Sequence, residues 1–181
     1  MPFNHLLNSL LALLFIALMA QVTLTTPEAL GGIPITGQSL AVLLVGLLLP
    51  SPYGGFTVLL YVLLGALGLP IFAEAKSGWQ VLSGGSGGFL VGFIIAAFAL
   101  GYLRQRGWGQ HLGWSLLANL LGTLVIVGFG VARLSMLYDF PRALDYGFFP
   151  FIKGAIIKIG LGGFIAWSML RQKPESANPT S

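Results

Sequence analysis

The sequence predicts an all-helical membrane protein, a bundle of six transmembrane helices with both termini in the cytoplasm. First, 56% of the 181 residues are hydrophobic and only 8% are charged, whereas a soluble domain is about 45–50% apolar and about 25% charged. Second, segments 29–73, 77–103 and 107–132 contain no Asp, Glu, Lys or Arg. Third, Pro and Gly clusters divide the chain into apolar segments, the longer of which approach the roughly 20 residues of a spanning helix.

The Pro and Gly clusters set the expected boundaries of six helices. The first is expected at residues 6–24. The second, at 38–49, ends at Pro50-Ser51-Pro52, and the third, at 55–69, ends at Pro70. The fourth, fifth and sixth are expected at 89–103, 112–134 and 151–170. Residues 1–173 then form a single integral-membrane domain, and residues 174–181 form a polar C-terminal tail.

The second and third segments are short for a full span, which leaves two interpretations open. They are either tilted or buried helices, or residues 36–70 form one bent hairpin that crosses the bilayer only partly. Short segments interrupted by Pro and Gly often carry ligand sites in transport proteins, because the freed backbone groups can line a cavity.

The orientation follows from the basic residues in the loops. Arg104 and Arg106 lie between the fourth and fifth helices, and Arg171 and Lys173 follow the sixth. With six spans these four residues lie on one side, and Lys and Arg are enriched in cytoplasmic loops. We therefore expect a multi-pass protein of the cell membrane with cytoplasmic termini.

Composition also excludes several classes of site. Cysteine is absent and the only histidines are His5 and His111, so we expect no disulfide and no metal centre. The few basic residues form no patch, which argues against a nucleic-acid partner. The chain lacks the phosphate-binding patterns GxxxxGK[ST] and GxGxxG, so we expect no bound ATP and no cofactor.

Lys158 is the candidate residue with the clearest chemistry. It lies deep in the sixth helix, where an ionisable residue is costly and usually faces a cavity or a partner. Gly154, Ala155 and Gly162 share its helix face by the spacing of three and four, and no predicted helix contains an acidic residue. This pattern favours binding of an anionic ligand, although close helix packing with a snorkelling lysine would also fit it.

Two polar segments offer hydrogen bonds to the same ligand. Thr36, Gln38 and Ser39 stand at the start of the second helix and suit a neutral polar head such as a urea or amide, or they cap that helix. The glycine-rich segment 84–88, with Gly85, Ser86 and Gly87, can present backbone N–H groups at the start of the fourth helix.

Aromatic residues gather around these loops and could form the walls of an apolar ligand site. The candidates are Tyr61, Phe72, Trp79 and Phe89, with Phe72 and Trp79 as possible lid residues. An aromatic belt at the membrane interface is the competing explanation.

Residues 84–87 also match the GxSG pattern of intramembrane rhomboid proteases. A serine nucleophile needs a base within hydrogen-bonding reach, and the sixth helix contains no histidine. A Ser86–Lys158 pair is the enzymatic alternative that survives, and we predict that the protein is not an enzyme.

Taken together, four segments resemble the BioY family, the biotin-specific membrane subunits of energy-coupling-factor transporters. They are residues 34–40 (PITGQSL), 60–72 (LYVLLGALGLPIF), 84–90 (GGSGGFL) and 150–158 (PFIKGAIIK), and their order and spacing cover most of the chain.

The resemblance implies a six-helix S component that captures biotin and works with a transmembrane coupling subunit and two ATPase subunits. It implies that Lys158 pairs with the valerate carboxylate, and that Thr36, Gln38, Ser39 and the 84–88 backbone meet the ureido ring.

Two positions depart from the family pattern. Ala155 stands where the family usually has Asp, and Gly-Gly-Ser-Gly-Gly-Phe replaces the usual Gly-Pro-Thr-Gly-Gly-Tyr. These departures leave open another small vitamin or carboxylate as the ligand.

Overall fold

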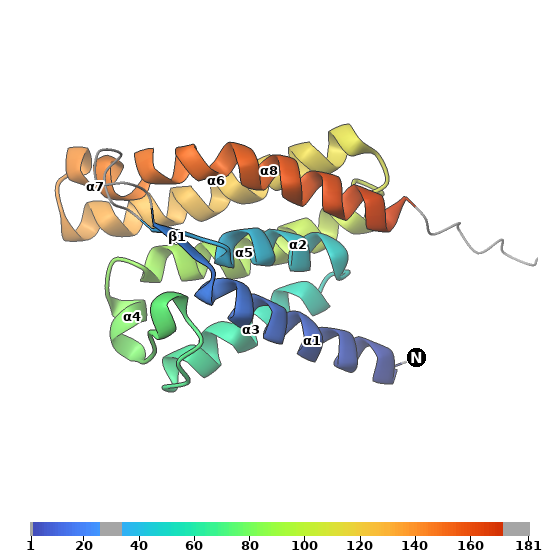
Figure 1. Cartoon of the computed structure of the whole chain (residues 1–181), viewed down its shortest axis with the longest axis horizontal. Helices are drawn as coiled ribbons and strands as arrows, with labels where there is room; N and C mark the ends of the chain where they lie inside the picture. Colours follow the sequence, from blue (N-terminus) through green and yellow to red (C-terminus); the bar gives the residue numbers. More distant parts are fainter. Residues whose placement is uncertain (1, 26–33, 172–181) are drawn as a thin grey trace, which may run out of the picture.

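A computed structural model describes residues 2–25 and 34–171, and within these ranges the chain is mainly helical (Figure 1). Each of the six segments expected to be helical is a helix. The elements are α1 (Pro2–Gln21), β1 (Thr23–Thr25), β2 (Pro34–Thr36), α2 (Gln38–Leu48), α3 (Tyr53–Ala66), a 3-10 turn η2 (Ala73–Ala75), α4 (Trp79–Ser83), α5 (Gly87–Gln105), α6 (Leu112–Leu137), α7 (Phe140–Gly147) and α8 (Phe149–Leu170). The predicted tail, residues 174–181, lies outside the described ranges.

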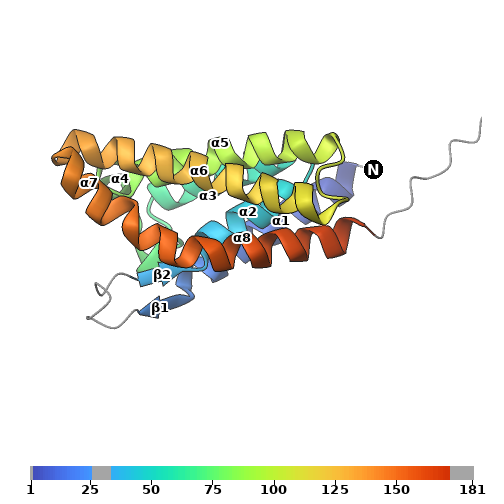
Figure 2. The same cartoon turned by 90° about the horizontal axis from the view of Figure 1, so that it is seen from above.

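Two short strands accompany the helices and correct the predicted end of the first one. The first helix ends at Gln21, not at residue 24, because Thr23 pairs with Thr36 in an antiparallel ladder of β1 and β2. The ladder, with the hydrogen bond from the Gly37 N–H to the Val22 carbonyl, places the end of α1 beside the start of α2. Figure 2 shows this strand pair at one edge of the bundle.

Two helices were not predicted from the sequence. The five-residue α4 precedes the glycine-rich segment, and α7 lies in the loop before α8. Pro141 lies in the first turn of α7, where proline is tolerated. Asp139 caps α7 by accepting the Arg142 backbone N–H at 2.9 Å, which satisfies a donor that the helix start leaves free.

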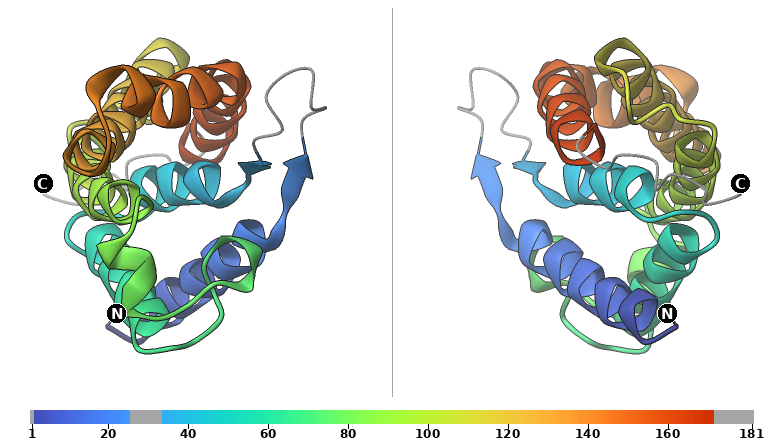
Figure 3. Two further views of the ribbon diagram at one scale, coloured as in Figure 1. Left: turned by 90° about the vertical axis from the view of Figure 1, so that its left-hand side faces the viewer. Right: turned by 90° about the vertical axis from the view of Figure 1, so that its right-hand side faces the viewer.

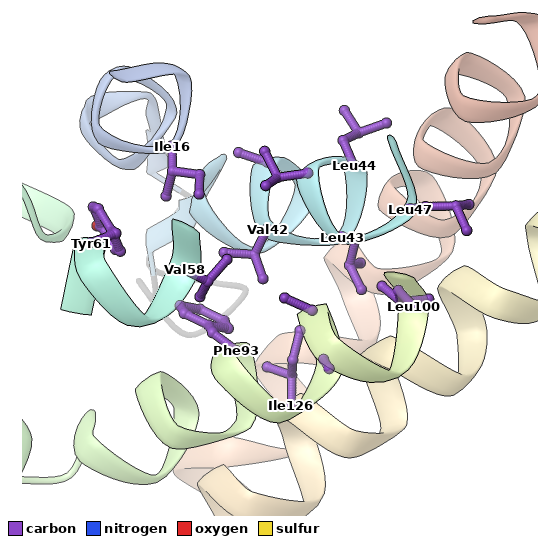
Figure 4. Packing of buried hydrophobic residues seen from close by; sticks show 14 of the residues in the cluster. Ile16, Val42, Leu43, Leu44, Leu47, Val58, Tyr61, Phe93, Leu100 and Ile126 are labelled. Atoms are coloured by element: carbon purple, nitrogen blue, oxygen red, sulfur yellow. The ribbon is translucent and has the colours of Figure 1, made fainter. Parts of the chain in front are cut away.

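Helix α2 forms the centre of the bundle. It is buried along nearly its whole length and packs against α1, α3, α5, α6 and α8, as the end-on views show (Figure 3). Val42 and Leu43 point toward α3 and α5 (Figure 4). A side chain at Gly46 would lie 3.0 Å from the Ala97 Cα, so α2 and α5 meet nearly backbone to backbone.

Three helices in the described ranges are long and apolar enough to cross a membrane by themselves. They are Asn4–Gln21, Gly87–Gln105 and Leu112–Leu137, and the bent pair Phe140–Ile152 and Gly154–Leu170 would add a fourth span. Helices α2 and α3 are apolar but shorter. The eleven residues of α2 reach about 17 Å at 1.5 Å per residue, well below the roughly 30 Å hydrocarbon core of a bilayer.

The bundle has two chemically different ends. At one end His5 stacks on Tyr53, Gln105 donates to the Ser51 carbonyl at 2.6 Å, and Leu170 lies in one hollow with Arg104. This end therefore holds the start of α1, the α5–α6 connection and the end of α8 (Figure 1). The strands, α4, α7 and the glycine-rich segment lie at the other end.

Candidate functional site

Lys158 extends from the middle of α8 toward the start of α2. It lies nine residues after Phe149, or about 14 Å along the helix axis. Its Nζ donates to the Ser39 Oγ at 2.8 Å and lies 5.5 Å from the centre of the Phe151 ring. Within the described residues the ammonium forms no ion pair, so its neighbours are a neutral hydroxyl and an aromatic face.

A cavity of about 200 Å³ opens beside this ammonium. Its walls come from β2, α2, the segment before α4, α5, α7 and α8, and no acidic residue lies among the lining residues in the described part of the chain. The lining residues are Thr36, Gln38, Ser39, Ala73, Ser86, Phe89, Leu90, Phe93, Tyr146, Pro150, Phe151, Gly154 and Lys158. An uncompensated ammonium in such a cavity favours an anionic ligand, because a buried charge needs a partner.

A chain of hydrogen bonds fixes the polar wall of the cavity. Gln38 is buried and donates from its Nε2 to the Tyr61 hydroxyl at 2.8 Å, and that hydroxyl donates to the Ile71 carbonyl at 2.8 Å. Without these bonds the Gln38 side-chain amide could flip, exchanging the positions of its nitrogen and its oxygen. Because the amide nitrogen is committed to Tyr61, the Gln38 oxygen is the group left to accept an N–H from a ligand.

The cavity also has an apolar wall. The rings of Phe89 and Phe151 stack face to face, with centres 4.9 Å apart and planes at 6°. Phe93 and Leu90 continue this wall along α5. The cavity thus combines one cation, several hydrogen-bonding groups and a flat aromatic surface, which is the usual composition of a small-molecule site.

Six of the eleven predicted site residues line this cavity together: Thr36, Gln38, Ser39, Ser86, Phe89 and Lys158. Phe72 instead lines an adjoining hollow of about 170 Å³ that shares Thr36, Gln38, Ala73, Ser86 and Leu90 with the cavity. Tyr61 lies behind Gln38, fully buried, and its ring meets Phe72 edge to face.

The three other predicted residues lie outside the cavity lining. Trp79 begins α4 and is 69% exposed. Gly85 borders a separate hollow beside Ser77 and Gln80. A side chain at Gly87 would overlap the Leu82 carbonyl oxygen, so this glycine is required by the close approach of α4 to the start of α5.

Several lining residues were not predicted from the sequence. Tyr146 belongs to α7, a helix that the sequence analysis did not anticipate, and Ala73 carries no chemical signal. Phe151 precedes Lys158 by seven residues, or two helical turns, and that spacing could have placed it on the same face of α8.

Comparison with known proteins gives concordant results. The model of the BioY family matches residues 2–175. A protein named biotin transporter BioY from Thermotoga maritima is 38% identical over 147 residues, covering 81% of this chain and 86% of the relative. A second, from Rhizobium etli, is 36% identical over 159 residues, covering 82% of this chain and 84% of the relative.

A solved structure has the same fold. It is the S-component for biotin from an ECF-type ABC transporter, with a TM-score of 0.82 and 24% sequence identity, covering 95% of this chain and 93% of the solved one. At this identity the likeness concerns the fold.

The Gln38–Tyr61–Ile71 chain generates a first prediction. Tyr61→Phe removes the hydroxyl and leaves the buried Gln38 amide nitrogen without its partner, while the Ile71 carbonyl keeps only the longer 3.5 Å bond from Gln21. An unsatisfied buried group costs about 1–3 kcal/mol, so the melting temperature of the ligand-free protein in detergent should fall. Tyr138→Phe changes an exposed tyrosine and should leave it unchanged. Equal melting temperatures for Tyr61→Phe and the wild type would show that this chain contributes nothing to stability.

Proposed function

Because this chain belongs to the BioY family, we propose that it takes up biotin, capturing the vitamin in the cavity beside Lys158. The relatives that carry the name biotin transporter cover most of the chain. The observation that carries the proposal is the ammonium without an acidic partner, set among neutral hydrogen-bonding groups in a cavity of ligand size. Biotin has the matching chemistry, with a carboxylate at one end and a neutral ureido ring at the other.

In the proposed binding mode the valerate carboxylate pairs with Lys158. Ser39 holds the ammonium from the α2 side through its 2.8 Å hydrogen bond. The ureido ring lies toward Thr36, the Gln38 oxygen and the 84–88 backbone with Ser86, and Phe89 contacts the apolar part of the ligand. The remaining predicted residues act indirectly. Tyr61 orients Gln38, Phe72 and Trp79 belong to the covering segments, and Gly85 and Gly87 shape the turn that presents Ser86.

We further propose that the chain is a multi-pass subunit of the cell membrane that works with a transmembrane coupling subunit and two ATPase subunits. The solved protein of the same fold is an S-component of an ECF-type ABC transporter, and this chain has no phosphate-binding loop of its own. Helix α1 presents an exposed row of leucines that suits lipid or an apolar partner helix. They are Leu6, Leu7, Leu10, Leu11, Leu14 and Leu18.

Six crossings, by α1, α2, α3, α5, α6 and α8, with cytoplasmic termini complete the proposal. The start of α1, the α5–α6 connection and the end of α8 lie at one end of the bundle. That end holds Arg104, Arg106 and Arg171, as expected of a cytoplasmic face. The cavity near the opposite end then opens outward, where biotin is captured.

The topology is tested by labelling single cysteines, because the chain has none of its own. Lys76 and Gln110 are both exposed and lie at opposite ends of the bundle. On intact cells a membrane-impermeant maleimide should label Lys76→Cys but reach Gln110→Cys only after permeabilisation. The reverse pattern would exclude an outward-facing cavity.

The role of Lys158 is tested by a cycle of two proteins and two ligands. A hydrogen bond to a charged group contributes about 1.5–3 kcal/mol. Because roughly 1.4 kcal/mol corresponds to a tenfold change in affinity, Lys158→Met should lower the affinity for biotin more than tenfold. Biotin amide has no carboxylate, and its affinity should change much less. Equilibrium binding of both ligands to the purified wild type and variant gives the comparison.

Arg106→Met provides the control. Its guanidinium is exposed and lies over the Tyr102 ring at the opposite end of the bundle, so removing it should leave the binding of both ligands nearly as in the wild type. If Lys158→Met weakens biotin and biotin amide equally, Lys158 supports the cavity and does not recognise the carboxylate.

Two alternatives remain distinct from biotin capture. A Ser86 hydrolase would need Lys158 as its base, yet Lys158 donates to Ser39, and the described residues contain no Ser86–Lys158 hydrogen bond. Ser86→Ala should therefore reduce biotin affinity modestly, by about 0.5–1.5 kcal/mol for one hydrogen bond. Covalent labelling of Ser86 by a fluorophosphonate, with product turnover, would support the hydrolase.

The second alternative is a different ligand. It would be identified if another vitamin displaced labelled biotin more strongly than unlabelled biotin does.

A further inference from the structure

The segment between α3 and α4 forms one wall of the cavity. Ala73 lines the cavity itself, and Phe72, Ala73, Glu74 and Lys76 line the adjoining hollow. The two spaces meet along this segment. Whether residues 71–76 stay in place therefore decides how well a ligand in the cavity is covered.

This wall contains a strained turn. Glu74 and Ala75 have φ angles of 59° and 54°, in the left-handed region that residues with a side chain adopt rarely. Two such residues in succession persist only where the surrounding structure holds them. Both side chains are exposed, so burial of these side chains does not hold the turn.

Gln21, the last residue of α1, bonds to both sides of the turn. Its Nε2 donates to the Phe72 carbonyl at 3.0 Å, and its Oε1 accepts the Ala75 N–H at 3.0 Å. The same Nε2 lies 3.2 Å from the Ala17 carbonyl of its own helix. One side-chain amide thus fastens the strained turn to α1, and Gln21 is absent from the lining of the cavity.

Other contacts anchor the two ends of the segment. Upstream of the strained residues, Tyr61 donates to the Ile71 carbonyl and packs against the buried Phe72 ring. Across the turn the Phe72 N–H donates to the Lys76 carbonyl at 3.1 Å, and downstream the Gly78 N–H donates to the Gly65 carbonyl at 2.7 Å. In the part of the chain that the structure describes, Gln21 makes the one side-chain hydrogen bond that reaches Ala75. Removal of this amide should therefore loosen the middle of the wall, residues 73–75, while both ends of the segment stay anchored.

We propose that Gln21 is a positioning residue for ligand capture: from α1, outside the cavity, it holds the 71–75 wall closed. The proposal rests on the proposed function in taking biotin as the ligand that the wall covers. Loss of the clamp removes no ligand contact, so the wall opens more often and bound biotin leaves faster. The association of biotin is not slowed, because an open wall does not obstruct entry.

The first experiment measures wall opening without any ligand. Ala73→Cys places the single thiol of the chain in the wall, at a partly buried position. Its labelling rate with a soluble maleimide should rise several-fold when Gln21→Met is added, since methionine keeps the length but forms neither hydrogen bond. Gln110→Met makes the same change at an exposed site at the opposite end of the bundle and should have no effect.

Two further variants separate a clamp from a general loosening of the fold. Ser135→Cys reports on a partly buried site of α6, and its labelling should not respond to Gln21→Met. Gln21→Glu keeps an acceptor for the Ala75 N–H, so with Ala73→Cys it should label more slowly than Gln21→Met. The clamp would be overturned if Gln21→Glu and Gln21→Met gave equal labelling rates at Ala73→Cys. It would also be overturned if Gln21→Met accelerated the labelling of Ser135→Cys as well.

The second experiment measures release of labelled biotin from proteins without introduced cysteines. Gln21→Met should raise the dissociation rate several-fold and leave the association rate at or above that of the wild type. If the wild type does not bind biotin, the proposed function fails, but the labelling experiment still tests whether Gln21 holds the wall. If the wild type binds biotin and neither labelling nor release changes, the clamp fails and the proposed function stands.

Discussion

Burial of α2 on all sides is the constraint on which this structure depends. The helix is too short to cross a bilayer alone, yet α1, α3, α5, α6 and α8 all contact it. A helix enclosed in this way needs no polar face, which fits its almost entirely apolar sequence. The exceptions are Gln38 and Ser39 at its start, and both face the cavity. The same helix therefore organises the core and supplies the floor of the site.

Several polar groups of the core donate within the bundle, as an apolar solvent requires, although the buried Asn119 Oδ1 has no partner among the described residues. Ser115 of α6 donates to the Gly163 carbonyl of α8 at 2.8 Å, which joins the two helices beside small residues. Asn119 and Thr123 donate to carbonyls one turn back on α6. Lys158 differs from these groups, since its charge is met by a neutral hydroxyl. In the proposed binding mode the ligand supplies the partner of this charge.

The two ends of the bundle differ in charge and in backbone structure. One end holds Arg104, Arg106 and Arg171 with the start of α1 and the end of α8. The other end carries irregular segments whose residues line the cavity and the adjoining hollow. Arg133 joins these segments to α6 by donating to the Ser83 and Gly84 carbonyls. Gln21 and Tyr61 do the same for the wall before α4, so the irregular parts around the cavity are held by side chains of regular helices.

The sequence by itself determined the helical membrane class, the six main helices and the position of the Lys158 charge far from the helix ends. These follow from local properties, namely apolar length, breaks at Pro and Gly, and the cost of a charge far from the helix ends. It also predicted Thr36, Gln38 and Ser39 as one polar group at the start of the second helix, because neighbours in the chain stay neighbours in the fold. The BioY resemblance was confirmed by the family match.

Only the tertiary structure decided which residues share the cavity. Tyr61 and Phe72 are aromatic in the sequence, but their burial behind Gln38 depends on how α3 meets α1 and α2. Trp79 faces outward because α4 lies at the surface, and Tyr146 reaches the cavity because α7 folds over it. Gln21 carries no sequence signal, since its partners at Phe72 and Ala75 lie some fifty residues away. Contacts between distant segments depend on how the helices pack, and helix packing is a property of the whole bundle that no single segment encodes.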